Sequence, residues 1–210
     1  MSNDSRTQTI GQVDFTMMYV AHEAFARDLG RMTQAAKRGD ALSPSVLAGW
    51  AMFTKQLHIH HTAEDDALWP PLRAKLTTRD ENAVLDEMEL EHAQIEPMLE
   101  RADRAIAAHD AVILLDTVRA LESDLTAHMQ HEEHEALPLV AKHLGPAGWK
   151  ALAGHIRRVQ GLSGAAEYLP WLLDERPEAT QARVLKVLPP PVRLLYRAVW
   201  RPRYHRTPRW

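Results

Sequence analysis

Apolar residues recur alternately three and four positions apart along four stretches between residues 14 and 132, which is the period of a helix with one buried face. Each stripe is long enough for a helix of several turns, and strand-like alternation is absent. Four such stripes predict an all-α fold, an up-down-up-down four-helix bundle. The stripes are Phe15, Met18, His22, Phe25, Leu29 and Met32; Trp50, Phe53, Leu57, His60, Glu64 and Ala67 or Leu68; Leu85, Met88, His92, Ile95, Leu99, Ala102 and Ile106; and Leu114, Val118, Leu121, Leu125, His128 and Glu132.

Turn and capping signals separate the stripes. The first helix is expected over about residues 14–38, and "GDALSP" ends it. Ser43 followed by Pro44 is a favourable N-cap with proline at the first helical position. The second helix is expected to end or kink at the prolines at 70 and 71, "TTRD" at 77–80 forms the next turn, and the chain reverses again near residue 110.

Six positions in these stripes are polar, although a buried His or Glu must be paired or coordinated. Counting from the turns predicts that they lie at similar heights: His22 and His60 are each nineteen residues from a turn near residue 41, and His92 and His128 are each eighteen from the turn near 110. The predicted layer therefore consists of His22, His60, Glu64, His92, His128 and Glu132.

The second and fourth helices carry copies of one motif. "HIHHTAEDDALWPP" at 58–71 and "HMQHEEHEALP" at 128–138 both have a His, a Glu four residues later and a Pro ten residues after the His. Residues four apart share a helix face, so imidazole and carboxylate can reach one ion or two neighbouring ions. Two hairpins, each supplying one His from its first helix and His-x-x-x-Glu from its second, predict a two-metal site.

Other ionisable residues near the motifs leave alternatives open. A frame that starts at His61 and ends at Asp65 competes with His60 and Glu64, but the spacing to Pro70 favours His60. Glu96, four residues after His92, is a candidate further ligand, a hydrogen-bonding partner or an exposed acid. Tyr19 is a candidate hydrogen bonder or ligand, with helix packing as the favoured role. The remaining neighbours are expected to be solvated or to contact ligands from outside, namely His58, His61, Asp65, Asp66, His131, Glu133, His134 and Glu135. A metal-free network of buried histidines and carboxylates is the less favoured alternative.

Composition restricts the chemistry. The 210 residues include no cysteine, which excludes thiolate metal sites, disulfides and cysteine nucleophiles. Nitrogen and oxygen ligands are compatible with zinc, manganese or iron, and carboxylates that can bridge two ions favour a pair of iron or a pair of manganese ions. Iron is the preferred metal. The formal charge of −3 implies no overall attraction to nucleic acid or to an anionic membrane. The polar N-terminus and the lack of a long apolar run predict a cytoplasmic protein without a membrane span.

These residues resemble the hemerythrin family, specifically bacterial hemerythrin-like proteins with a His-His-Glu cation-binding repeat. The resemblance covers roughly residues 10–145 and rests on His22 in "YVAHEAFARDL", His92 in "ELEHAQIEPML" and the two motifs above. It implies two non-haem iron ions with an oxo or hydroxo bridge in a four-helix bundle. The four histidines of the layer would be terminal ligands, and Glu64 and Glu132 would bridge the ions.

The family resemblance also shapes the expected activity. Oxygen-carrying hemerythrins use five histidines and two carboxylates, with a His-x-x-x-His pair in the third helix, whereas this third helix offers His92 and Glu96. The expected function is therefore binding of, or reaction with, hydrogen peroxide or dioxygen, including catalase-like peroxide consumption, rather than simple oxygen storage. The alternative is an iron, oxygen or nitric oxide sensor that signals through its C-terminal segment. The sequence assigns no catalytic residue.

The C-terminal part of the chain differs from the bundle. The expected organisation is a flexible N-terminus at 1–12, the bundle at 13–145 and a helical extension at 146–210. From Arg183 onward there are eight basic residues and no acid. Two interpretations remain open, a patch for nucleic acid or an acidic membrane, and a segment that packs on the bundle through its aromatic residues with its arginines in water. The second is favoured, so nucleic acid is not an expected partner.

Overall fold

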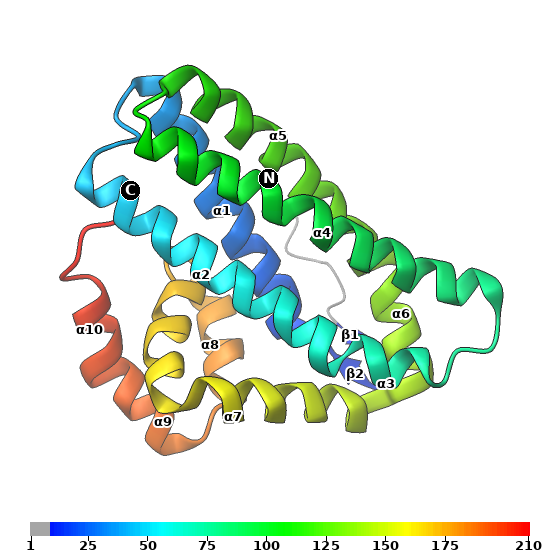
Figure 1. Cartoon of the computed structure of the whole chain (residues 1–210). Helices are drawn as coiled ribbons and strands as arrows, with labels where there is room; N and C mark the ends of the chain where they lie inside the picture. Colours follow the sequence, from blue (N-terminus) through cyan, green and yellow to red (C-terminus); the bar gives the residue numbers. More distant parts are fainter. Residues whose placement is uncertain (1–8) are drawn as a thin grey trace.

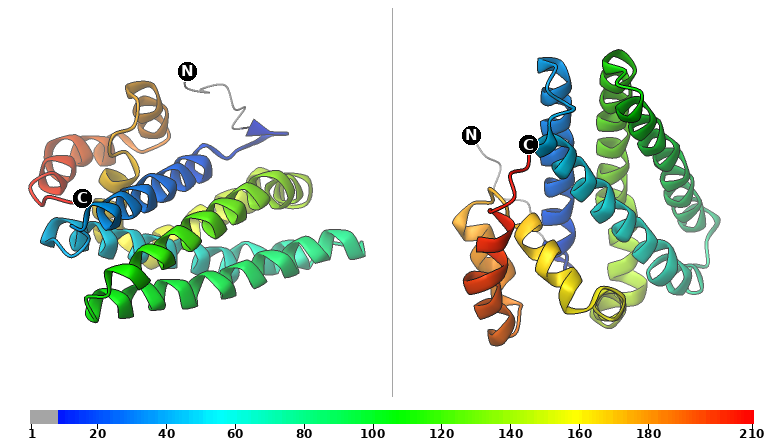
Figure 2. Two further views of the ribbon diagram at one scale, coloured as in Figure 1. Left: turned by 90° about the horizontal axis from the view of Figure 1, so that it is seen from above. Right: turned by 60° about the vertical axis from the view of Figure 1, so that its left-hand side comes forward.

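The computed structural model describes residues 9–210, and four long helices form its centre (Figure 1). Helices α1 (Thr16–Arg38), α2 (Pro44–Ala67), α4 (Arg79–Ala107) and α5 (Ala111–His131) pack side by side in an antiparallel bundle (Figure 2). The predicted all-α fold is confirmed. The only strands among the described residues are β1 (Thr9–Ile10) and β2 (Val13–Asp14), a short antiparallel hairpin before α1. The N-terminal segment expected at 1–12 lies outside the described residues up to residue 8.

The ends of the helices follow the local sequence. Gly39 adopts a left-handed conformation (φ 79°) at the end of α1, and Pro44 occupies the first turn of α2. The Thr78 hydroxyl accepts a hydrogen bond from the Glu81 amide at the start of α4. Asp110 likewise accepts bonds from the first amides of α5. These caps fix where each helix begins, and therefore the height of every residue along the bundle.

Prolines shape the segments that follow α2 and α5. The chain continues from α2 into α3 (Trp69–Arg73), and from α5 through the π-helical turn η1 (Glu132–Ala136), α6 (Leu137–Leu139) and a second π-helical turn, η2 (Val140–Leu144). Both π turns end two residues before a proline, Pro138 or Pro146. Because proline lacks an amide hydrogen and its ring crowds the preceding turn, the regular hydrogen-bond pattern cannot continue there.

The C-terminal extension consists of five helical segments beside α1 and α2 (Figures 1 and 2). Helix α7 bends at Gly161, which has a φ of 60°. After α8 the chain forms one continuous helical stretch from residue 190 to residue 204, in which a third π turn precedes Pro202. The segments are α7 (Gly145–Leu172), α8 (Glu178–Lys186), α9 (Pro190–Leu195), η3 (Tyr196–Trp200) and α10 (Arg201–Tyr204).

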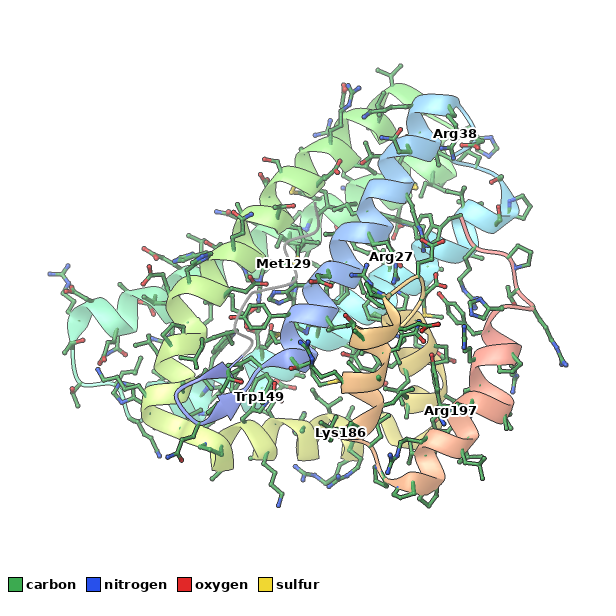
Figure 3. The ribbon with its side chains drawn as sticks, turned by 180° about the vertical axis from the view of Figure 1, so that it is seen from behind. Arg27, Arg38, Met129, Trp149, Lys186 and Arg197 are labelled. Carbon is green, nitrogen blue, oxygen red and sulfur yellow. The ribbon has the colours of Figure 1, made fainter. Side chains whose placement is uncertain are left out.

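A buried carboxylate attaches this extension to the bundle. Asp28 on α1 is fully buried and accepts a hydrogen bond from the Trp171 indole at 2.7 Å. The same carboxylate accepts bonds from Arg27 and Arg31. Arg27, which lies where α1 meets the extension (Figure 3), also donates to the backbone carbonyls of Trp171 and Asp174. The extension is therefore joined to α1 by a charged network as well as by packing.

Two apolar clusters make up the core of the bundle. One contains Phe25, Phe53 and Leu121 together with Trp171 and Trp200 of the extension. The other lies toward the opposite end of the bundle and contains residues such as Phe15, Trp69, Leu85, Leu137 and Leu152. The layer of buried histidines and carboxylates separates them.

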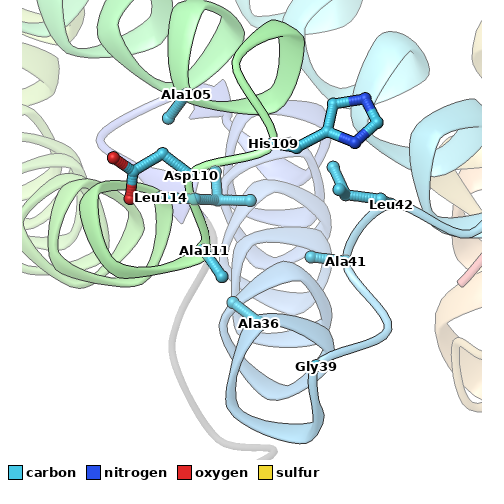
Figure 4. A pocket seen from close by; sticks show the side chains of 9 residues that line it. All are labelled: Ala36, Gly39, Ala41, Leu42, Ala105, His109, Asp110, Ala111 and Leu114. Carbon is cyan, nitrogen blue, oxygen red and sulfur yellow. The ribbon is translucent and has the colours of Figure 1, made fainter.

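The described residues also contain a small cavity of about 50 Å³ between the α1–α2 and α4–α5 turns (Figure 4). It is lined mainly by small apolar residues, with His109 and Asp110 at the α4–α5 turn. His109 is seventeen residues along the chain from His92, which corresponds to about 25 Å of helix. The cavity is therefore separate from the polar layer. No helix within residues 9–210 combines the length and the apolar character needed to cross a bilayer.

The Asp28 network leads to a stability prediction. Asp28→Ala removes the shared acceptor of one indole and two guanidinium groups, so we expect the free energy of unfolding to fall by about 3 kcal/mol. Urea unfolding followed by tryptophan fluorescence measures the change. Asp116→Ala, at an exposed site on α5, is the control and should change stability by less than about 0.5 kcal/mol. Equal effects of the two substitutions would contradict a structural role for the network.

Candidate metal centre

The six polar residues predicted from the stripes all lie in the layer between the two apolar clusters. Five are buried, and His60 is 14% exposed. Together with His61, their ring and carboxyl atoms form two groups, which are connected by the carboxylate of Glu64. Each group brings together potential ligand atoms that lie within 4.8 Å of one another.

The first group contains His22, His60 and Glu132, from α1, α2 and η1. The His22 Nε2 atom lies 3.0 Å from the Glu132 Oε2 atom. The His22 and His60 rings meet edge to face, with their centroids 5.4 Å apart. Three helical elements therefore direct two imidazoles and a carboxylate toward one point.

The second group contains His61, His92 and His128, from α2, α4 and α5. The His61 and His92 rings stack at 4.0 Å, and the His92 and His128 rings meet edge to face at 4.8 Å. All three side chains are buried. This group consists of imidazoles alone.

Glu64 connects the two groups. Its Oε1 atom lies 3.2 Å from His60 Nε2 in the first group, and its Oε2 atom lies 3.7 Å from His92 Nε2 in the second. The two oxygens of one carboxylate thus face different groups. A carboxylate placed in this way could contribute one oxygen to each group.

Nine ligand-type atoms in the layer are buried without a hydrogen-bond partner in the protein. They are the Nε2 atoms of His22, His60, His61, His92 and His128 and both carboxylate oxygens of Glu64 and Glu132. Several of these atoms approach one another closely, but none is aligned as a hydrogen bond. Because a buried polar atom without a partner is costly, bound cations would satisfy a set of this kind. The donors fit a pair of metal ions with nitrogen and oxygen ligands.

Burial and neighbouring charges shift the pKa values of the residues in this layer. Burial disfavours the imidazolium form of His22, but the negative charges of Glu132 and Glu133, together with the hydrogen bond to Glu133, outweigh it and raise the pKa of His22 to about 9. Burial, together with the charge of His22, lowers the pKa of His60 to about 3. Burial and the charge of Glu132 raise the pKa of Glu64 well above its ordinary range. A bound cation would favour the deprotonated forms of these side chains, because metal ligands must lose their protons.

Carboxylates hold the outer nitrogens of three of the imidazoles. The pairs are His22 Nδ1 with Glu133 Oε1 at 2.9 Å, His92 Nδ1 with Asp65 Oδ1 at 2.9 Å, and His128 Nδ1 with Glu91 Oε2 at 2.8 Å. Glu91 also contacts the Nδ1 atom of His131 at 2.8 Å. In each pair Nδ1 can donate its hydrogen to the carboxylate, so the lone pair of Nε2 faces the interior of the layer and could bind a metal ion.

His61 is the residue that sequence reasoning placed differently. Its position next to His60 puts it about 100° around α2 from the stripe, and we expected it to be solvated or outside the ligand set. It is instead 8% exposed and stacks on His92. Residues of both competing frames therefore take part in the polar layer. His60 and Glu64 lie within it, and Asp65, four residues after His61, contacts His92 from outside. The signal in the sequence was the adjacent pair of histidines.

The remaining candidates lie outside the two groups. Glu96 is exposed on α4, and His58 is exposed on α2. Tyr19 packs in the second apolar cluster. His134 and Glu135 are exposed, as expected.

The extension reaches the edge of this layer. The Phe25 ring lies 5.1 Å from the His60 ring and 5.1 Å from the Trp171 ring, and Tyr168 lies 5.6 Å from Trp171. Burial and the charge of Glu64 raise the pKa of Tyr168, so this phenol is within electrostatic reach of the layer. The aromatic residues of α7 therefore cover the α1–α2 side of the candidate centre.

Comparison with known families agrees with this site. The model of the hemerythrin HHE cation binding domain matches residues 13–140, more than half of the chain, and the match contains every residue of both groups. No curated protein and no solved structure matches the chain significantly. Because the family match covers the bundle and its buried His and Glu residues, the chain belongs to the hemerythrin HHE cation-binding domain family.

Proposed function

We propose that this protein binds two non-haem iron ions in the polar layer and that the resulting centre binds or reacts with hydrogen peroxide or dioxygen, with peroxide consumption as the expected reaction. The observation that carries the proposal is the set of nine buried ligand atoms without protein partners. Membership of a cation-binding family supports the same conclusion. Bound iron would supply Lewis acidity and the ability to exchange electrons with a small oxygen species.

The proposed ligand set is larger than the sequence suggested. With His61 it contains five imidazoles and two carboxylates: His22, His60, Glu64, His61, His92, His128 and Glu132. Three imidazoles lie in one group and two in the other. The group with fewer imidazoles, His22 and His60, leaves more room for a small molecule. This composition also matches the five histidines and two carboxylates of oxygen-carrying hemerythrins, so dioxygen binding gains support relative to the expectation from the sequence.

The surrounding residues would prepare the ligands. Glu133, Asp65 and Glu91 accept hydrogen bonds from the outer nitrogens and thereby fix the tautomer and ring orientation of three histidines. Phe25, Trp171 and Tyr168 limit water at the His60 side. In a drier environment the charges of ligands and substrate interact more strongly.

A second candidate function is sensing through the extension. It is favoured by the contact of Phe25 with both His60 and Trp171, because a change in the position of His60 on metal binding would be passed to α7. The ligand sensed would be iron itself, dioxygen or nitric oxide. In this case the extension, rather than a reaction product, carries the output.

Metal content is the first test of the proposed function. Protein purified without a metal-affinity tag and analysed for elements should contain close to two iron ions per chain. His61→Ala removes one imidazole of the three-histidine group, so about one ion should be lost or bound at least tenfold more weakly. His58→Ala is the matched control, since its exposed side chain precedes the ligands on the same helix. Failure of the wild-type protein to take up iron on anaerobic reconstitution would reject the centre, and unchanged iron in His61→Ala would remove His61 from the ligand set.

The same preparations test reactivity. Iron-loaded wild-type protein and His58→Ala should change their visible absorption on addition of peroxide or dioxygen and should consume peroxide faster than free iron does. A full complement of iron with no response to either molecule would reject the proposed reaction while retaining cation binding.

Glu91→Gln tests the outer carboxylates. The amide weakens the hydrogen bonds to His128 and His131, so we expect affinity for iron to fall about 10- to 100-fold with the fold retained. Competition with a chromophoric chelator measures the affinity. Glu100→Gln, an exposed substitution two to three turns further along α4, should leave it unchanged. An affinity equal to that of the wild type in both variants would show that Glu91 does not support the ligands.

Sensing predicts that iron protects the extension from proteolysis. Cleavage within residues 146–210 should be several-fold slower in iron-loaded than in metal-free protein. Phe25→Leu should reduce this difference, because Phe25 joins His60 to Trp171. Phe53→Leu is a control with a similar loss of buried ring in the same cluster. Equal cleavage rates with and without iron in the wild-type protein would argue against sensing through this segment.

A further inference from the structure

Charge is strongly divided between the two parts of this chain. All 28 acidic residues precede Arg183, whereas eight of the 25 basic residues lie from Arg183 to the C-terminus. With neutral histidines, the formal charge is −11 for residues 1–182 and +8 for residues 183–210. The net charge of −3 therefore conceals a basic segment attached to an acidic body.

The continuous helical stretch at 190–204 uses one face to pack on the protein. Tyr196, Trp200 and Tyr204 are buried and lie four residues apart, which places them along one side. Their rings belong to the same apolar cluster as Phe25 and Trp171. The favoured interpretation of the tail as a segment that packs through its aromatic residues agrees with this face.

The opposite face is apolar and exposed. Leu194, Ala198 and Pro202 are also four residues apart, and Leu195 and Val199 lie beside them. Leu194 is 68% exposed and Val199 is 48% exposed. We call these five residues the outer ridge. A helix that buries aromatic residues on one side has no need of aliphatic residues on the other for folding, so the ridge points to a partner.

Basic residues flank the outer ridge. Arg197, Arg201 and Arg203 are exposed, as is Lys186 at the end of α8. Among the described residues, Arg176 between α7 and α8 forms an ion pair with Glu23, whereas no ion pair engages Arg197, Arg201 or Arg203. Their charges are available to an anionic surface.

We propose that the outer ridge and its flanking arginines bind the surface of an anionic phospholipid bilayer. Aliphatic side chains would enter the boundary between headgroups and acyl chains, while the guanidinium groups contact lipid phosphates and carboxylates. The acidic body, with its charge of −11, is repelled by the same surface, so the protein docks tail first. Nucleic acid is the less favoured partner, because its phosphate backbone offers nothing to an exposed aliphatic ridge. This surface lies outside the family match at 13–140, and the inference does not depend on the proposed function.

Flotation of the full-length, metal-containing protein with vesicles tests the proposal. Vesicles of phosphatidylcholine with about 30% phosphatidylserine should bind at least tenfold more protein than phosphatidylcholine alone. Binding should weaken as salt rises from about 0.05 to about 0.5 M, because screening shortens the range of the attraction. Equal binding to both vesicle types, or none to either, would overturn the proposal.

Variants separate the two components of the surface. Arg197→Glu with Arg201→Glu should reduce binding to anionic vesicles at least tenfold, and Leu194→Gln with Val199→Gln should reduce it several-fold. The controls are Arg101→Glu with Arg119→Glu, which give the same change in net charge on exposed bundle positions, and Leu90→Gln, another exposed leucine. All variants are first shown to unfold at the same temperature as the wild type.

Three results would overturn the lipid assignment. The control charge reversal could reduce binding as much as the tail variant, which would indicate a response to net charge alone. The substitutions in the outer ridge could have no effect, which would leave only a cationic surface. A single-stranded oligonucleotide at equal phosphate concentration could displace the protein from vesicles, which would identify nucleic acid as the preferred partner.

Discussion

The burial of nine unpaired nitrogen and oxygen atoms in one layer is the constraint on which the rest of this structure depends. Such a layer costs free energy in a protein interior unless cations or protons balance its carboxylates and lone pairs. His22 and Glu132 lie within ion-pair distance, while burial and the charge of Glu132 raise the pKa of the Glu64 carboxyl. The bundle is thus built as two apolar clusters on either side of a polar layer, and its stability is linked to what occupies that layer.

This constraint explains several local features of the fold. The layer draws its imidazoles and carboxylates from four helices at one height, so the caps at Gly39, Thr78 and Asp110 matter because they set where each helix starts or ends. The π turn that begins at Glu132 places that carboxylate just after α5, where the wider turn changes the direction of the following side chains. Pro138 enforces this turn. The proline ten residues after His128 is therefore part of the geometry of the site.

The sequence was sufficient for the four helices and for the grouping of His22, His60, Glu64, His92, His128 and Glu132. Periodicity along each helix determines which residues face the core, and counting from the turns determines their height. The same reasoning could not place His61, because its burial depends on how α2 packs against α4 and on the stacking of His61 on His92. A residue 100° away from a stripe is exposed on an isolated helix but buried where two helices meet. The path of the extension was also beyond sequence reasoning, since it depends on the bend at Gly161 and on the contact of Trp171 with Asp28.

The extension has two sides with different chemistry. Its inner side reaches the polar layer through Trp171 and Phe25, and its outer side carries exposed aliphatic residues among arginines. Both sides belong to segments that pack in one apolar cluster, which includes Trp171, Tyr196 and Trp200. A shift of α7 caused by a change at His60 would therefore be transmitted to the helix that bears the outer ridge, because closely packed side chains do not move independently. Attachment to a membrane would in turn restrict that helix, so any effect of metal on attachment must have an equal effect of attachment on metal affinity.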